Sequence, residues 1–187
     1  MTKLVLAKAS EGTVKVFDDC NVLGLLSIAT YLREYGNHHV QILNTSVDDA
    51  FAQITRTKPE MVGITSMAYT QKYATELAAK IKESLDLPVI LGGVHVSTLP
   101  SQLPDVFDAG VIGEGEATML ELVQNFEKTG NIFDEHIKGL AASKSGRLVI
   151  NESRPPIEPL DNIPMLDRSL LGEQYAQQRS LIRIGQQ

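Results

Sequence analysis

Glycines and carboxylates stand directly after two predicted strands of this sequence, where they can contact a bound ligand. Gly92 and Gly93 follow the apolar run Pro88–Leu91 (PVIL), and adjacent glycines allow a ligand to approach the backbone closely. Gly113–Glu116 (GEGE) opens a predicted helix, and its carboxylates can accept hydrogen bonds from ribose hydroxyls or amides. They make a poor phosphate site, because they repel an anion. A tight turn after the strand and stabilisation of the helix dipole explain the same residues without a ligand.

The remaining polar side chains of interest each have a structural interpretation beside a functional one. Ser66 can hydrogen-bond a ligand or cap the next helix, and taken alone the cap is the better explanation. His95 lies within reach of the glycines, yet a single His is more often a polar edge residue than a ligand. His38 and His39 fall in a turn before the second predicted strand and are expected on the surface. Cys20 has no basic neighbour that would activate its thiol, so we expect no catalytic thiolate.

Composition and missing motifs exclude several classes of function. The net charge of −6, without a cluster of Lys or Arg, argues against a nucleic-acid binder, and no apolar run is long enough to span a membrane. The single Cys20 excludes an internal disulfide and a Cys-based zinc or iron–sulfur site. There is no GxGxxG after the first strand, no Walker-type phosphate loop and no G-x-S-x-G nucleophile elbow. Since no signal peptide is recognisable, we expect a cytoplasmic, ligand-binding protein that catalyses nothing by itself.

Short β-branched runs alternate with stretches of helical period, which predicts a doubly wound α/β fold around a parallel five-stranded sheet. The predicted strands are Lys3–Lys8, Val40–Leu43, Met61–Thr65, Pro88–Leu91 and Ala109–Ile112. The predicted helices are Val22–Tyr35, Val47–Arg56, Tyr69–Ser84 and Ala117–Glu127, with Ser46 capping the second and a possible short helix after Gly93. In such a sheet, ligands bind beyond the carboxyl ends of the strands, where the strand order reverses.

The last part of the sequence differs in kind. Lys138–Ser143 and Arg147–Asn151 flank a turn with glycine and predict a β-hairpin. The following segment, 153–164 (SRPPIEPLDNIP), is rich in proline, which excludes regular helix and inner strand. We therefore divide the chain into a ligand-binding domain, 1–130, and a hairpin with a linker, 131–187, that leads toward a domain outside this sequence. The core is expected to survive deletion of the residues beyond about 152.

Taken together, these segments resemble the N-terminal cobalamin-binding domain of radical SAM enzymes, in the group of methyltransferases and anaerobic magnesium-protoporphyrin monomethyl ester cyclases. The segments that carry the resemblance are Leu23–Gly36 (LGLLSIATYLREYG), Val62–Met67 (VGITSM), Pro88–Pro100 (PVILGGVHVSTLP) and Val111–Val123 (VIGEGEATMLELV). Arg154–Leu171 resembles the segment by which those enzymes pass into the radical SAM barrel. The resemblance covers the chain from about Leu4 to Leu171.

This resemblance implies a Rossmann-like, flavodoxin-type sheet that holds cobalamin at its carboxyl edge, with the dimethylbenzimidazole tail inside the domain. Leu23, Gly24, Leu25 and Ser27 would then lie near the corrin, and Ser66 and Met67 would line the tail cavity. Gly92 and Gly93 would let the tail pass close to the backbone, with His95 and Ser97 at the mouth of the cavity. Gly113, Glu114, Gly115 and Glu116 would border the same cavity. The resemblance implies no catalytic residue and no metal ligand in this chain.

Two departures from related families qualify the expectation. Cobalamin carriers of the methionine synthase type place a D-x-H-x-x-G motif after the first strand, whereas the loop Lys8–Gly24 contains no His. We therefore expect base-off cobalamin without a histidine ligand from this chain. The CxxxCxxC motif of the radical SAM barrel is also absent, so the 4Fe–4S cluster and S-adenosylmethionine would belong to a separate parent domain, in cis or in trans.

The resemblance implies that the chain holds cobalamin for methyl transfer or oxidative cyclisation carried out with that domain. One alternative is a degenerate α/β module that lost its ligand and acts in protein–protein interaction. Another is a stand-alone corrinoid carrier, which the missing histidine disfavours.

Overall fold

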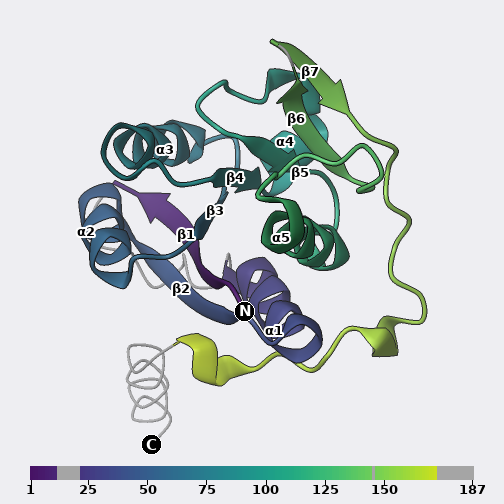
Figure 1. Ribbon diagram of the computed structural model, residues 1–187. Helices are drawn as coiled ribbons and strands as arrows, with labels where there is room; N and C mark the ends of the chain where they lie inside the picture. The colour runs from purple at the N-terminus through teal and green to yellow at the C-terminus, as the bar shows by residue number, and fades with distance from the viewer. Residues whose placement is uncertain (12–21, 145, 172–187) are drawn as a thin grey trace, which may run out of the picture.

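The computed structural model describes residues 1–11, 22–144 and 146–171, and shows a central seven-stranded sheet with helices on both faces (Figure 1). Its strands are β1 (Lys3–Ser10), β2 (His39–Ser46), β3 (Met61–Thr65), β4 (Val89–Gly92), β5 (Ala109–Val111), β6 (Leu140–Lys144) and β7 (Arg147–Ile150). Its α-helices are α1 (Leu23–Gly36), α2 (Val47–Thr57), α3 (Gln71–Leu85), α4 (Val94–Thr98) and α5 (Glu116–Thr129). Short 3₁₀ turns are η2 (Pro100–Gln102), η3 (Leu160–Asn162) and η4 (Arg168–Leu171). None of the helices in the described part is long and apolar enough to cross a membrane.

The strand order β2-β1-β3-β4-β5-β6-β7 has the flavodoxin-type start that the family resemblance implies. The first five strands are parallel, and β6 and β7 continue the sheet in antiparallel pairing. The predicted hairpin is therefore present, but it does not stand apart from the domain: Ala142 pairs with Ala109 of β5, and Leu140 is fully buried. The sheet thus extends to Ile150, past residue 130, and the domain boundary at that residue stays a prediction.

Each face of the sheet is covered by its own pair of helices (Figure 1). The helices α2 and α3 pack on one face, where Ile54 and Leu77 are fully buried. On the other face lie α1 and α5, with Leu32 and Leu122 fully buried. Strand residues alternate between these two cores, as the period of a strand requires.

The helix ends allow the predicted capping residues to be compared with the observed ones. The Ser46 Oγ accepts a hydrogen bond from the Asp49 N–H at 3.2 Å, which confirms the predicted cap of α2. The cap of α3 is Thr70, so the capping interpretation of Ser66 is wrong. The Ser66 hydroxyl instead donates to the side chain of Gln71, the first residue of that helix.

His38 is a further correction, because the structure buries the side chain that the sequence places on the surface. Only 3% of His38 is exposed, and its Nδ1 accepts a hydrogen bond from the Thr2 N–H at 3.2 Å. Burial lowers the pKa of His38, against the opposing influence of the Glu127 carboxylate 3.6 Å away. His39 is exposed, as expected.

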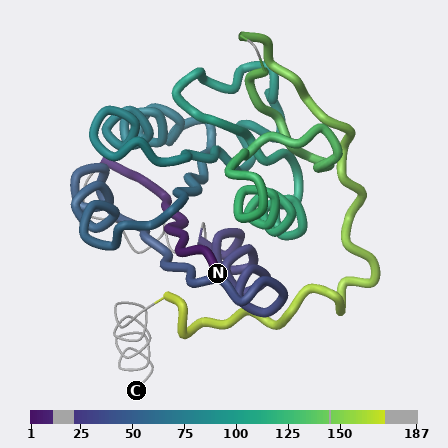
Figure 2. The backbone as a smooth tube through the Cα atoms, in the orientation of Figure 1, coloured from purple at the N-terminus to yellow at the C-terminus, as the bar shows by residue number. Residues whose placement is uncertain are grey.

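The proline-rich segment 151–171 runs along the outside of the molecule, from β7 past α5 to α1 (Figure 2). Near its start, Arg154 pairs with Glu121 of α5 and donates to the Thr118 Oγ1 at 2.8 Å. Near its end, Asp167 pairs with Arg33 of α1 at 2.9 Å, and Leu170 packs against the core. We call this segment the strap. Its polar contacts tie it to the domain at both ends.

Candidate functional site

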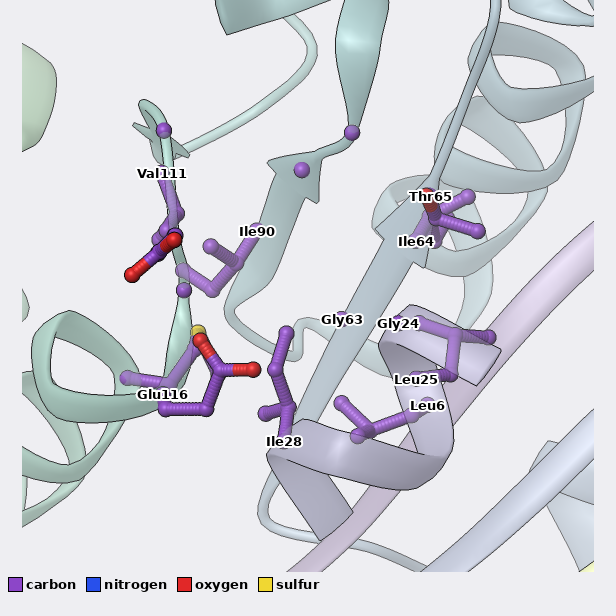
Figure 3. A pocket seen from close by; sticks show the side chains of 16 residues that line it. Leu6, Gly24, Leu25, Ile28, Gly63, Ile64, Thr65, Ile90, Val111 and Glu116 are labelled. Atoms are coloured by element: carbon purple, nitrogen blue, oxygen red, sulfur yellow. The ribbon is translucent and has the colours of Figure 1, made fainter. Parts of the chain in front are cut away.

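A cavity of about 270 Å³ opens at the carboxyl edge of the sheet, on the face covered by α1 and α5 (Figure 3). It lies where the chain order reverses between β1 and β3, the place at which doubly wound sheets bind ligands. The strands contribute Leu6, Gly63, Ile64, Thr65, Ile90 and Val111. The first helix contributes Gly24, Leu25 and Ile28. Gly92, the last residue of β4, and Gly93 after it line the cavity, together with Gly113, Glu114 and Gly115 before α5 and Glu116 and Met119 in its first turns.

Glycines create much of the space. Gly92 follows Ile90 by two residues and so faces the same side of β4, and a Cβ at Gly92 would meet no atom within 4 Å. Any side chain at this position would therefore stand in the cavity. Gly93 has a different role: its φ of +96° and the Ser66 carbonyl oxygen, 2.6 Å from an added Cβ, leave no room for a side chain.

Glu116 brings a carboxylate into this largely apolar cavity. It is the first residue of α5 and only 9% exposed, and in Figure 3 its carboxylate points toward Ile28. The Ser27 hydroxyl of α1 donates to its Oε1 at 2.6 Å. This hydrogen bond joins α1 to α5 across the cavity wall. Glu114, by contrast, is exposed at the opening.

Ser97 holds the two glycine-containing loops together. Its hydroxyl donates to the Gly93 carbonyl oxygen and accepts from the Gly113 N–H, both at 2.9 Å. Because both functions of the hydroxyl are used, Ser97 positions the loops rather than offering a free polar group.

The structure brings most of the predicted site residues together. The predicted residues that line the cavity are Gly24, Leu25, Gly92, Gly93, Gly113, Glu114, Gly115 and Glu116. Ser27 reaches it only through Glu116, and Ser97 acts through the loops. The structure does not place Leu23, Ser66, Met67 or His95 on the cavity wall. Cys20 and most of the loop after β1 lie outside the described residues.

Sequence reasoning missed the apolar walls, because it examined only the loops after the strands. The missed residues are Leu6, Ile28, Gly63, Ile64, Thr65, Ile90, Val111 and Met119. Their spacing did contain the signal: Gly63 and Thr65 share one face of β3, and Ile28 and Met119 each stand three residues after a predicted site residue on a helix.

The size of the cavity limits what it can hold. Pockets for whole small molecules have volumes of roughly 300–1,000 Å³, so this cavity suits a compact ring system or one branch of a larger ligand. Within the described ranges, no group of three His, Cys, Asp or Glu side chains is arranged to hold a metal ion.

Known proteins are similar to this chain over the part that forms the cavity. The sequence profile of the B12 binding domain matches residues 12–123. An uncharacterized methyltransferase of Pyrococcus horikoshii is 33% identical over 161 residues, which cover 80% of this chain and 34% of that protein. The anaerobic magnesium-protoporphyrin IX monomethyl ester cyclase of Rubrivivax gelatinosus is 32% identical over 149 residues, covering 73% of this chain and 26% of the cyclase.

Solved structures show the same fold. The cobalamin-dependent S-adenosylmethionine radical enzyme OxsB, with aqua-cobalamin and S-adenosylmethionine bound, matches with a TM-score of 0.76 at 17% identity over 94% of this chain and 25% of OxsB. The radical S-adenosylmethionine methyltransferase TsrM of Kitasatospora setae, with cobalamin and a 4Fe–4S cluster bound, matches with a TM-score of 0.61 at 22% identity over 85% of this chain and 30% of TsrM. The chain spans about a third or less of the length of these proteins.

Proposed function

This chain belongs to the B12-binding domain family, and we propose from that premise that its cavity receives the nucleotide tail of cobalamin. The observation that carries the proposal is the glycine-lined cavity at the carboxyl edge of the sheet. Its volume of about 270 Å³ excludes the corrin macrocycle but accommodates a bicyclic base. The corrin would then lie outside the cavity, over the edge of the sheet.

The walls of the cavity fit such a tail. Leu6, Ile28, Ile90 and Met119 offer apolar contacts for both faces of an aromatic ring. The open space beside Gly92 lets the ring approach the backbone of β4. A base in this position would not reach cobalt, so the residues of the cavity would hold the cofactor base-off. No histidine of this chain lies in the loop after β1 to replace it.

Exposed apolar side chains at the same edge support the placement of the corrin. Leu23 is 46% exposed at the start of α1, and Val94 is 62% exposed just after the cavity loop. Both would be covered by the macrocycle, whose burial of apolar surface stabilises binding. The corrin contact expected at Leu23 thus remains part of the proposal, although the residue lies outside the tail cavity.

The catalytic partner in this proposal is a radical SAM domain, in cis or in trans. The curated relatives are about three or more times longer than the matched region, and the solved relatives are radical S-adenosylmethionine enzymes. Bound cobalamin would supply methyl-group or electron transfer to chemistry that a 4Fe–4S cluster and S-adenosylmethionine initiate in that domain. In this proposal the residues of this chain bind and orient the cofactor. The reaction would be a methyl transfer or an oxidative cyclisation.

Incubation of the purified chain with hydroxocobalamin, followed by desalting and an absorbance spectrum, tests this proposal. We expect the folded protein to retain the chromophore in a stoichiometric amount. A folded protein that stays colourless would contradict it and favour the degenerate interaction module. A bound chromophore with intact methyl-transfer competence in the absence of any second domain would favour the stand-alone carrier.

A further inference from the structure

The carboxylate of Glu116 lines the proposed tail cavity, and one of its two oxygens has no hydrogen-bond donor among the described residues. Among the described residues, the Ser27 hydroxyl is its only hydrogen-bond donor, and it binds Oε1. Oε2 keeps contact with solvent through the cavity, although only 9% of the residue as a whole is exposed. Ile28 lies opposite the carboxylate (Figure 3), and the other charged side chain of the wall is Glu114.

A carboxylate oxygen in such a place favours a ligand that donates a hydrogen bond. Leaving an acceptor unpaired on burial costs free energy, and hydrogen bonds to charged groups are stronger than neutral ones. When a ring fills the cavity, the water that can reach Oε2 is displaced. If the ring does not then present an N–H or O–H toward Glu116, the free-energy cost of desolvating the carboxylate weakens binding.

We propose that Glu116 determines which nucleotide base this site prefers, by accepting a hydrogen bond from an N–H of the base. The inference rests on the proposed entry of the tail into the cavity. An adenine-type base carries an exocyclic amino group with two such hydrogens. Dimethylbenzimidazole carries two methyl groups, and at pH 8 its released ring nitrogen presents only a lone pair, which the carboxylate repels. The site therefore selects corrinoids whose base is an amine-bearing purine.

The test compares dissociation constants at pH 8 for three methyl-corrinoids: methylcobalamin, its analogue with adenine as the base, and methylcobinamide, which lacks the nucleotide. For the unaltered chain we expect the adenine form to bind about tenfold more tightly than methylcobalamin, the ratio that one charge-assisted hydrogen bond produces. Methylcobinamide sets the affinity of the corrin alone.

Glu116→Gln is the informative variant, because it keeps a carbonyl oxygen for Ser27 and replaces the second oxygen by an amide donor. The amide can donate to the ring nitrogen of dimethylbenzimidazole, so the preference should shift toward methylcobalamin. Glu76→Gln, the same change at an exposed position of α3, should leave the preference unaltered. Circular dichroism verifies that each variant is folded.

The outcomes separate this inference from the proposed function. Equal affinity of the unaltered chain for both bases, or an equal loss of both in Glu116→Gln, would overturn the selection by Glu116 while leaving cobalamin binding in place. Failure of every corrinoid to bind the folded chain would overturn the proposed function and this inference together. A retained preference in Glu116→Gln would assign the selection to another residue.

Discussion

Filling the space beside Gly92 should abolish tail binding without unfolding the protein. An added Cβ there meets no atom within 4 Å, and the position lies in β4, where a β-branched residue is well tolerated. In Gly92→Val the side chain would occupy the volume of the cavity that the ring needs. Gly92→Ala would intrude by a single methyl group.

The expected magnitudes follow from the apolar area at stake. A bicyclic aromatic group buries about 150–250 Å², as large aromatic side chains do. At about 25 cal/mol per Å² this burial stabilises the complex by roughly 4–6 kcal/mol. Complete exclusion of the ring in Gly92→Val should therefore raise the Kd for cobalamin by about 10³ to 10⁴. In Gly92→Ala the added methyl group should remove apolar contact of the ring equal to about one methylene group. The Kd for cobalamin should therefore rise about fourfold.

Titration of the purified variants with methylcobalamin, followed by visible absorbance, measures this series. Methylcobinamide serves as the ligand control, since its binding does not need the cavity and should stay unchanged. Ser143→Val, at an exposed position of β6, is the matched protein control. Thermal denaturation verifies that Gly92→Val is folded. If the folded variant still binds methylcobalamin as tightly as the unaltered chain, the placement of the tail is refuted.

The remaining predictions concern stability and the geometry of the loops. The pKa of His38 is lowered in the folded state, so its contribution to stability is present above about pH 6.5 and is lost as the pH falls through the folded pKa. Urea denaturation at pH 7.5 and 5.5 should show this loss, and His38→Gln should flatten the slope; an unchanged slope would contradict the assignment. A chain ending at residue 152 lacks the strap contacts of Arg154 and Leu170 and should stay folded with a loss of about 2 kcal/mol, measured by urea denaturation. Unfolding of that chain would show that the strap belongs to the core. Ser97→Ala removes the link between the glycine-containing loops and should weaken cobalamin binding about tenfold at unchanged circular dichroism, whereas full affinity would show that the link is dispensable.

Local sequence signals were sufficient for the first five strands and the helices that cover them. Apolar runs and helical periods located the elements, and Ser46 capped the predicted helix. The sequence also located the glycine and GEGE loops of the site, because parallel strands must end at the same edge of the sheet. These inferences depend on neighbours along the chain, which a sequence displays directly.

What remained hidden depends on contacts between distant segments. His38 is buried beside Thr2, which lies 36 positions earlier at the start of the neighbouring strand and whose N–H donates to the His38 Nδ1. No residue near His38 in the sequence indicates that contact. The bond of Ser27 to Glu116 joins residues 89 positions apart. Likewise, the pairing of β6 with β5 could not be read from a hairpin pattern that is equally compatible with a separate linker.

Electron paramagnetic resonance of the chain loaded with cob(II)alamin tests the central claim most directly. A nitrogen ligand below cobalt, from the base of the cofactor or from a histidine, splits the cobalt lines into triplets. If the tail lies in the cavity beside Gly92 and no histidine replaces it, the bound cofactor will show lines without this splitting. Triplets from cob(II)alamin bound to the folded chain would place nitrogen on cobalt and contradict the base-off arrangement.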